Sequence, residues 1–124
     1  MIELTLPWPP SVNGYWRHPR VGKLAGRNLI SEEGRAYRST VQQVIISAFL
    51  VNAASGGRLA IEIQAAPPDR RRRDLDTILK ALLDSLTHAG LIEDDSQFDA
   101  IAIARLPVEK PGRVDIKIYQ LENL

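Results

Sequence analysis

The chain has 124 residues, of which 44% are apolar, a net charge of +1 and no cysteine. This length suits one domain with a real core, and the lack of cysteine excludes disulfides, thiolate catalysis and a cysteine-based zinc site. Because His18 and His88 are the only imidazoles, a histidine-rich metal site is excluded as well. No apolar run approaches the roughly 20 residues that a membrane span requires.

The first half of the chain predicts a strand, a long loop, a helix and a second strand. Residues 2–6 alternate between apolar and polar side chains, as a strand does, and prolines end the pattern. Residues 7–30 show no period, so we expect a long loop of the kind that is functional or mobile. Apolar residues then recur every three or four positions, which predicts a helix over about 31–53, broken by Gly56-Gly57. Residues 59–65 predict the second strand.

The second half predicts a helix followed by two strands. Apolar side chains from Leu75 to Leu86 recur at helical spacing, and Gly90 suits the position just beyond a helix end. Residues 97–107 alternate as a third strand, and a turn leads to a fourth strand over 114–121. The order β-α-β-α-β-β predicts a single α+β domain, residues 1–124, with a mixed sheet and two main helices.

Charge is distributed unevenly along the sequence. Residues 1–73 hold 11 Lys or Arg against 5 Asp or Glu, whereas residues 74–124 hold 5 against 10. The boundary falls where four arginines, Arg70 to Arg73, run into Asp74 and Asp76. Adjacent phosphate-binding and cation-binding groups favour a protein that acts on a phosphodiester backbone. Two alternatives remain: the charges segregate by chance, and the arginines form a solvated run.

The carboxylates Asp74 and Asp76 are spaced so that both can reach one cation in an extended entry to a helix. Oxygen ligands suit Mg²⁺, and Asp95 can supply a third one from just beyond the helix. The alternative is helix capping, which explains one aspartate well but leaves Asp94 and Asp95 without a role. Residue types favour the metal site.

Lys80 and the loop at residues 7–30 each allow two interpretations. Lys80 can stabilise charge at the scissile phosphate, but its spacing from Asp76 favours a surface ion pair one helical turn away. In the loop, Trp8, Tyr15 and Trp16 stand among basic groups that include Arg17. These aromatics can stack on unpaired bases or simply fix the loop to the core, and the sequence does not separate the two.

Taken together, these segments resemble the RusA-type Holliday junction resolvases over nearly the whole length. The resemblance rests on the following stretches: Leu6-Pro7-Trp8-Pro9-Pro10-Ser11 with Asn13, Ser31-Glu32-Glu33-Gly34 with Tyr37-Arg38, Pro68-Asp69-Arg70-Arg71-Arg72-Arg73-Asp74-Leu75-Asp76 with Lys80, Asp94-Asp95-Ser96-Gln97, and Lys110-Pro111-Gly112-Arg113. Members of this family are small homodimeric endonucleases, many carried by phages and prophages, that cleave four-way DNA junctions with Mg²⁺ or Mn²⁺.

The resemblance implies metal-binding carboxylates at Asp74, Asp76 and Asp95 and a catalytic lysine at Lys80, which overrides the ion-pair interpretation. It implies that Asn13 lies near the DNA, although the neighbouring Val12 stands where the family pattern often has a polar residue. The preference for Asp95 over Asp94 comes from the family pattern alone. Arg17 and the arginines of residues 70–73 are the expected phosphate contacts.

We therefore expect a cytoplasmic, homodimeric, Mg²⁺-dependent crossover junction endodeoxyribonuclease of DNA recombination and repair, with Mn²⁺ as a possible substitute. We expect no membrane association and no cofactor besides the metal. Two alternatives are a junction-binding protein without catalysis and a metal nuclease acting on other branched DNA. The intact set of Asp74, Asp76, Asp95 and Lys80 argues against the first of these.

Overall fold

A computed structural model describes residues 1–121 of the chain. Eleven segments of regular structure follow one another along this range. The strands are β1 (Ile2–Pro7), β2 (Trp16–Arg17), β3 (Leu29–Ile30), β4 (Leu59–Ala66), β5 (Phe98–Arg105) and β6 (Arg113–Gln120). The α-helices are α1 (Val12–Tyr15), α2 (Glu32–Ser47) and α3 (Leu79–His88), and two short 3-10 helices are η1 (Leu75–Ile78) and η2 (Asp95–Gln97).

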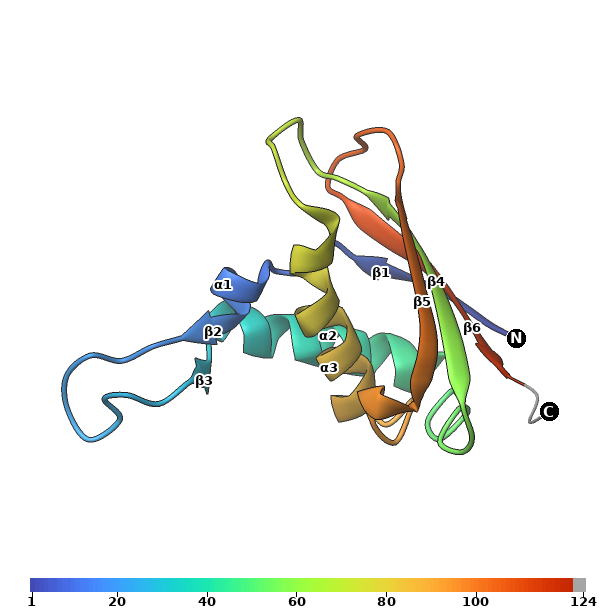
Figure 1. Cartoon of the computed structure of the whole chain (residues 1–124), viewed down its shortest axis with the longest axis horizontal. Coiled ribbons are helices and arrows are strands. Elements are labelled where there is room, and N and C mark those ends of the chain that lie inside the picture. The colour runs from blue at the N-terminus through green and yellow to red at the C-terminus, as the bar shows by residue number, and fades with distance from the viewer. Residues whose placement is uncertain (122–124) are drawn as a thin grey trace.

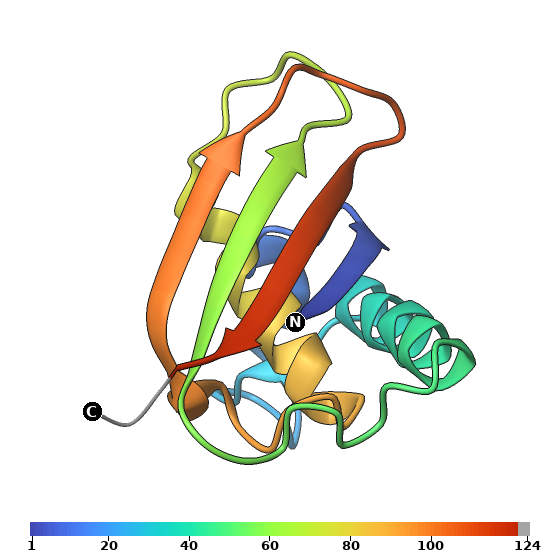
Figure 2. The ribbon, with the colours of Figure 1, turned by 90° about the vertical axis from the view of Figure 1, so that its right-hand side faces the viewer.

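Four long strands form one mixed sheet in the order β1-β6-β4-β5. Strands β4 and β5 are parallel, while β6 is antiparallel to both β1 and β4. Helices α2 and α3 cover one face of this sheet (Figure 1), and the other face is open (Figure 2). The predicted α+β domain with a mixed sheet and two main helices is therefore confirmed.

The core lies between the sheet and these two helices. Strand β4 alternates as the sequence predicts, because Ile61 and Ile63 are buried while Glu62 and Gln64 face solvent. The helices bury Val41, Ile45, Leu82 and Leu86 against this face, together with residues of β6. Burial of each such side chain stabilises the fold by roughly 1.5–3 kcal/mol. The core therefore holds α3 against the sheet, and with it the residues at the N-terminal end of that helix.

Helix α2 ends at Ser47, six residues before the predicted end. The amide of Phe49 bonds to the carbonyl of Ile46, and the amide of Leu50 bonds to that of Ile45. This is the hydrogen-bond pattern of a Schellman motif, in which one residue adopts a left-handed conformation. That residue is Phe49, with φ 58°, so the usual glycine signal is missing here and Gly56-Gly57 was the wrong end point.

Helix α3 ends as predicted. Gly90 follows it with φ 79°, and the amides of Gly90 and Leu91 bond to the carbonyls of Thr87 and Leu86. The predicted helix start is divided, because residues 75–78 form the 3-10 helix η1 before α3 begins. No helix within the described residues is long and apolar enough to cross a membrane.

Residues 7–30 are more ordered than the predicted loop. Ser11 caps α1 by accepting a hydrogen bond from the amide of Gly14. Strands β2 and β3, each two residues long, pair with each other in antiparallel fashion. Elements this short show no period in a sequence, which explains why the prediction missed them. The segment between β2 and β3 projects away from the sheet and helices (Figure 1).

Candidate functional site

Asp74 and Asp76 stand at the entry to η1, directly after the arginine run. Asp74 is in the extended conformation at the N-cap position, yet its side chain makes no capping hydrogen bond. Both aspartates are exposed. Within residues 1–121, neither carboxylate makes a hydrogen bond or an ion pair. The structure therefore does not support capping by the Asp74 side chain, and both carboxylates are available to an external cation.

Asp94 and Asp95 have different roles in the fold. Asp94 is the N-cap of η2, and its carboxylate accepts the amide of Ser96 at 3.0 Å. The Gln97 side chain in turn accepts a hydrogen bond from the amide of Asp94 at 3.1 Å, through Oε1, and this completes a capping box. Hydrogen bonding from Ser96 is the main reason that the pKa of Asp94 lies below its ordinary value. Asp95 is not a helix cap in the part of the chain that the structure describes, and its side chain is exposed.

Gln97 anchors the acidic connector to the turn before β4. Its side chain is buried, and its Oε1 accepts the amides of Glu93 and Asp94. Its Nε2 donates to the carbonyls of Ala54 and Gly57, at 3.2 and 3.1 Å. The glutamine of the Asp-Asp-x-Gln segment thus holds the backbone that carries Asp95, a role that the sequence did not reveal.

Lys80 lies in the first turn of α3, and its side chain is 43% exposed. Its nearest carboxylate is Asp84 Oδ1, 4.0 Å from Lys80 Nζ, one turn later in the helix. The ion pair with Asp76 that the spacing favoured is not formed. Lys80 Nζ also lies 5.6 Å from the centroid of the Trp16 ring, within cation–π range. The charge of Lys80 contributes in a minor way to the lowered pKa of Asp94.

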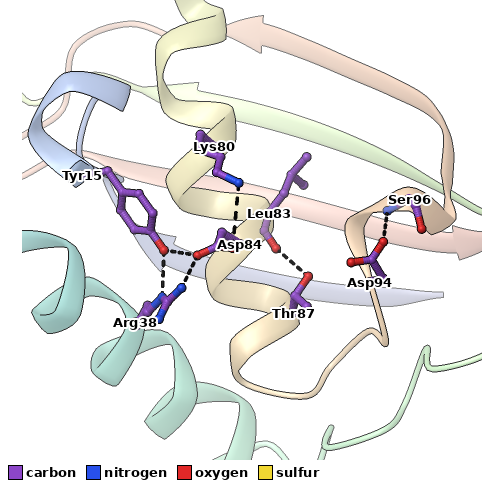
Figure 3. A network of polar contacts seen from close by, with 8 residues as sticks. All are labelled: Tyr15, Arg38, Lys80, Leu83, Asp84, Thr87, Asp94 and Ser96. Atoms are coloured by element: carbon purple, nitrogen blue, oxygen red, sulfur yellow. Dashed lines mark hydrogen bonds and ion pairs between the residues drawn. The ribbon is translucent and has the colours of Figure 1, made fainter. Parts of the chain in front are cut away.

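Asp84 is held by a closed ring of hydrogen bonds from two other helices (Figure 3). Its Oδ2 accepts from the Tyr15 hydroxyl and from Arg38 Nη2, the latter at 2.5 Å. Arg38 Nε in turn donates to the Tyr15 hydroxyl oxygen at 2.8 Å. Burial, reinforced by Asp84, raises the pKa of Tyr15 to about 12. Burial also acts to raise the pKa of Asp84, but the bonds from Tyr15 and Arg38 outweigh it and leave that pKa below its ordinary value.

This ring was not predicted. The sequence carries one signal of it: Asp84 stands four residues after Lys80, the same spacing that separates Lys80 from Asp76 on the other side. Tyr15 is completely buried, so it pins the segment before β2 to the helices. For this aromatic residue, the structure favours the anchoring role over base stacking.

The arginine run divides into one partly buried member, Arg73, and three exposed ones. Arg73 Nη2 lies 2.7 Å from Asp69 Oδ1, and the Arg73 guanidinium stacks 5.8 Å from the centroid of the Trp8 ring. The Arg73 side chain therefore stabilises the loop that carries it, and its guanidinium occupies the face of the Trp8 ring. Arg71 is 84% exposed and only loosely paired, at 3.7 Å from Asp69 Oδ2. Arg70 and Arg72 are also exposed.

Asn13 and Arg17 project from the proline-rich segment. Asn13 is an exposed residue of α1, and Arg17 is an exposed residue of β2. Arg17 directly follows Trp16, whose ring faces Lys80. The segment from α1 to β2 thus places the exposed Asn13 and Arg17 side chains close in sequence to Trp16, which contacts the first turn of α3.

The oxygen ligands offered by the exposed aspartates suit a hard divalent cation, but in the described part of the chain they are not already gathered around one point. Asp74 and Asp76 offer unengaged carboxylate oxygens, the ligands that Mg²⁺ takes, and Mg²⁺ is commonly held by one or two carboxylates with water and phosphate. Within residues 1–121, no three histidine, aspartate or glutamate side chains are gathered so that they could hold one ion. The three predicted ligands Asp74, Asp76 and Asp95 are therefore not brought together in the isolated chain.

Comparisons with known proteins give a consistent answer. The family described as Endodeoxyribonuclease RusA matches residues 7–119. A protein of Enterobacteria phage HK97 named "Crossover junction endodeoxyribonuclease rusA" is 47% identical over 122 residues, covering 98% of this chain and 97% of the relative. Proteins of the same name from Shigella sonnei (strain Ss046) and Escherichia coli (strain K12) are 44% and 43% identical, each covering 98% of this chain and 96% of the relative.

Proposed function

The chain belongs to the endodeoxyribonuclease RusA family, and from this premise we propose that it resolves four-way DNA junctions by metal-dependent hydrolysis of phosphodiester bonds. The observation that carries the proposal is the state of the aspartates. Asp74, Asp76 and Asp95 are exposed and unengaged within the described residues, whereas the neighbouring Asp94 is used as a cap. Exposed acids without internal partners are what a cation site requires.

The family uses a divalent metal, and we propose Mg²⁺, with Mn²⁺ as a substitute. Asp74 and Asp76 would hold it, and Asp95 is the proposed third ligand. When bound there, the ion supplies an activated water and stabilises the leaving oxygen.

The chain's own groups would do the remaining work. The Lys80 ammonium would stabilise negative charge that develops on the phosphate during attack. The exposed guanidiniums of Arg70, Arg71 and Arg72 would bind the backbone on either side, together with Asn13 and Arg17. Arg73 would contribute indirectly by shaping the loop, since its guanidinium is engaged with Asp69 and Trp8.

A homodimer completes the proposal. Resolving a four-way junction requires two paired cuts, and one chain carries one set of catalytic residues, so a two-fold pair supplies two related sites. We expect light scattering to give a dimer in solution. A monomer both free and on junction DNA would contradict this part. We also expect the protein to act in the cytoplasm of a bacterial or phage-infected cell, during recombination and repair.

The decisive experiment compares wild type with Asp76→Asn on a labelled synthetic four-way junction. Wild type should cut symmetrically with Mg²⁺ and stop when a chelator is added. Asp76→Asn should lose cleavage by orders of magnitude, because asparagine removes a ligand charge, while junction binding persists or tightens as repulsion falls. A variant that still cuts at the wild-type rate would refute the metal assignment.

A flap or replication-fork substrate of equal length belongs in the same assay. Preference for the four-way junction supports resolution. Equal or faster cutting of the other branched substrates would instead favour the second candidate, a general nuclease for branched DNA. Junction binding without any cutting would favour a non-catalytic binding protein.

A further inference from the structure

We propose that Asp84 is a positioning residue for the cleavage reaction, which orients the ammonium of Lys80 toward the scissile phosphate. The inference rests on the proposed function, because it assigns a partner to the lysine of that same site. Neither the family resemblance nor the sequence pattern gave Asp84 any role. The observation behind it is that the two carboxylate oxygens of Asp84 contact different partners: one is bonded to Arg38, and the other faces Lys80 (Figure 3).

Oδ2 of Asp84 is fully committed to the fold. It accepts from the Tyr15 hydroxyl and from Arg38, and these two donors also bond to each other. The three side chains come from α1, α2 and α3, so the carboxylate is fixed in orientation by two separate elements. Oδ1 takes no part in this ring and faces Lys80 Nζ at 4.0 Å. One oxygen is anchored, and the other is left for the lysine.

The charge of Asp84 suits this task. Its side chain is only 24% exposed, yet the hydrogen bonds from Tyr15 and Arg38 overcome the effect of burial and keep its pKa low. The carboxylate is therefore negative at neutral pH and attracts the ammonium of Lys80. A separation of 4.0 Å is loose for an ion pair and does not neutralise the lysine, whose side chain remains partly exposed.

A second contact limits the lysine from another side. The Trp16 ring lies 5.6 Å from Lys80 Nζ, and it packs edge-on against Tyr15 with ring centroids 5.3 Å apart. Tyr15 thus contacts both partners of Lys80, Asp84 and Trp16. A long, flexible lysine carries large rotamer freedom. Contacts from two sides reduce that freedom before substrate arrives, which is what a group acting on a transition state requires.

The simpler alternative is that Tyr15, Arg38 and Asp84 only tie three helices together. That role predicts a change in stability and no specific dependence on Lys80. The positioning role predicts a loss of chemistry with binding retained, and this loss must disappear once Lys80 is absent. The two roles therefore differ in a double-mutant cycle.

The test measures single-turnover cleavage of a four-way junction, metal-free junction affinity and melting temperature for each variant. Asp84→Asn keeps the shape of the side chain and removes its charge. We expect its cleavage rate constant to fall by about 10- to 100-fold, with junction affinity within roughly threefold of wild type, since the substitution lies off the arginine surface. In a Lys80→Ala background, adding Asp84→Asn should produce no further loss.

A matched pair of tyrosine variants keeps the test valid if Asp84→Asn does not fold. Tyr15→Phe removes the hydroxyl that anchors Asp84 Oδ2. Tyr37→Phe removes a hydroxyl that donates only to the carbonyl of Pro7, at 2.8 Å. We expect Tyr15→Phe to slow cleavage severalfold and Tyr37→Phe to leave it unchanged.

Each outcome is decisive. Additive losses in the Lys80→Ala background, or equal effects of the two tyrosine variants, would overturn the positioning role. Cleavage by wild type with no loss in Asp84→Asn would overturn this inference and leave the proposed function intact. A wild-type protein that cuts no junction would overturn both.

Discussion

Replacing Gln97 with alanine tests whether the acidic connector is held as the structure indicates. The buried amide of Gln97 makes four hydrogen bonds, to the amides of Glu93 and Asp94 and to the carbonyls of Ala54 and Gly57. The bond to Ala54 is buried, and the other three reach backbone groups that are more open to water. Gln97→Ala removes all four at once and frees the segment that carries Asp95.

The expected cost follows from what each partner loses. An exposed partner regains water, so each of the three outer bonds is worth roughly 0.5 kcal/mol, whereas the unsatisfied buried carbonyl of Ala54 costs roughly 1.5–2 kcal/mol. The free energy of unfolding should therefore fall by about 3 kcal/mol. For a domain of this size, 1 kcal/mol moves the melting temperature by about 4 °C, so the melting temperature should fall by about 12 °C.

Calorimetry and junction cleavage measure the two consequences. Gln120→Ala is the matched control, because its Nε2 makes one exposed bond, to Gly56 in the same turn, at 3.1 Å. The control should melt within about 2 °C of wild type and cut normally, since surface changes usually stay within about 0.5 kcal/mol. Gln97→Ala should melt lower and, measured well below its melting temperature, cut more slowly. If Gln97→Ala melts within 3 °C of wild type and cuts as fast, the connector is not held by these bonds.

Three further outcomes are expected. Asp95→Asn should abolish cleavage, whereas Asp94→Asn should keep it, because asparagine caps a helix as well as aspartate does. Gel assays of junction cleavage by both variants measure this, and the reverse result would contradict the assignment of Asp95. Alanine at Arg71 and Arg72 together should flatten the log–log salt dependence of junction binding by about 0.9 per lost phosphate contact; an unchanged slope in a fluorescence titration would show that both arginines are merely solvated. Asp84 should make wild type more acid-sensitive than Asp84→Asn. Because the pKa of Asp84 is lowered by folding, its contribution is present above the unfolded pKa of about 3.9 and is lost as the pH falls below it. Denaturant unfolding between about pH 5 and 3 should therefore give a shallower decline for the variant, and parallel declines would refute this.

The sequence predicted the features that depend on local chemistry. Alternation in β4 and the glycine after α3 each act within a few residues, so both were readable, and the strand and the helix end were confirmed. The arginine run that leads directly into Asp74 and Asp76 was likewise visible in one stretch. It carried the family resemblance that the comparisons bear out.

The tertiary structure decided the features that depend on residues distant in the chain. Asp94 and Asp95 are chemically identical, and the physical difference between them is the capping box that Asp94 forms with Gln97. Helix α2 ends at Ser47 because Phe49, two residues later, adopts a left-handed conformation, which nothing in the local sequence requires. Asp84 and Tyr15 are 69 positions apart, and they meet because α1 and α3 pack beside each other. Such contacts arise from how the helices pack on the sheet, and a reading of short segments carries no information about that packing.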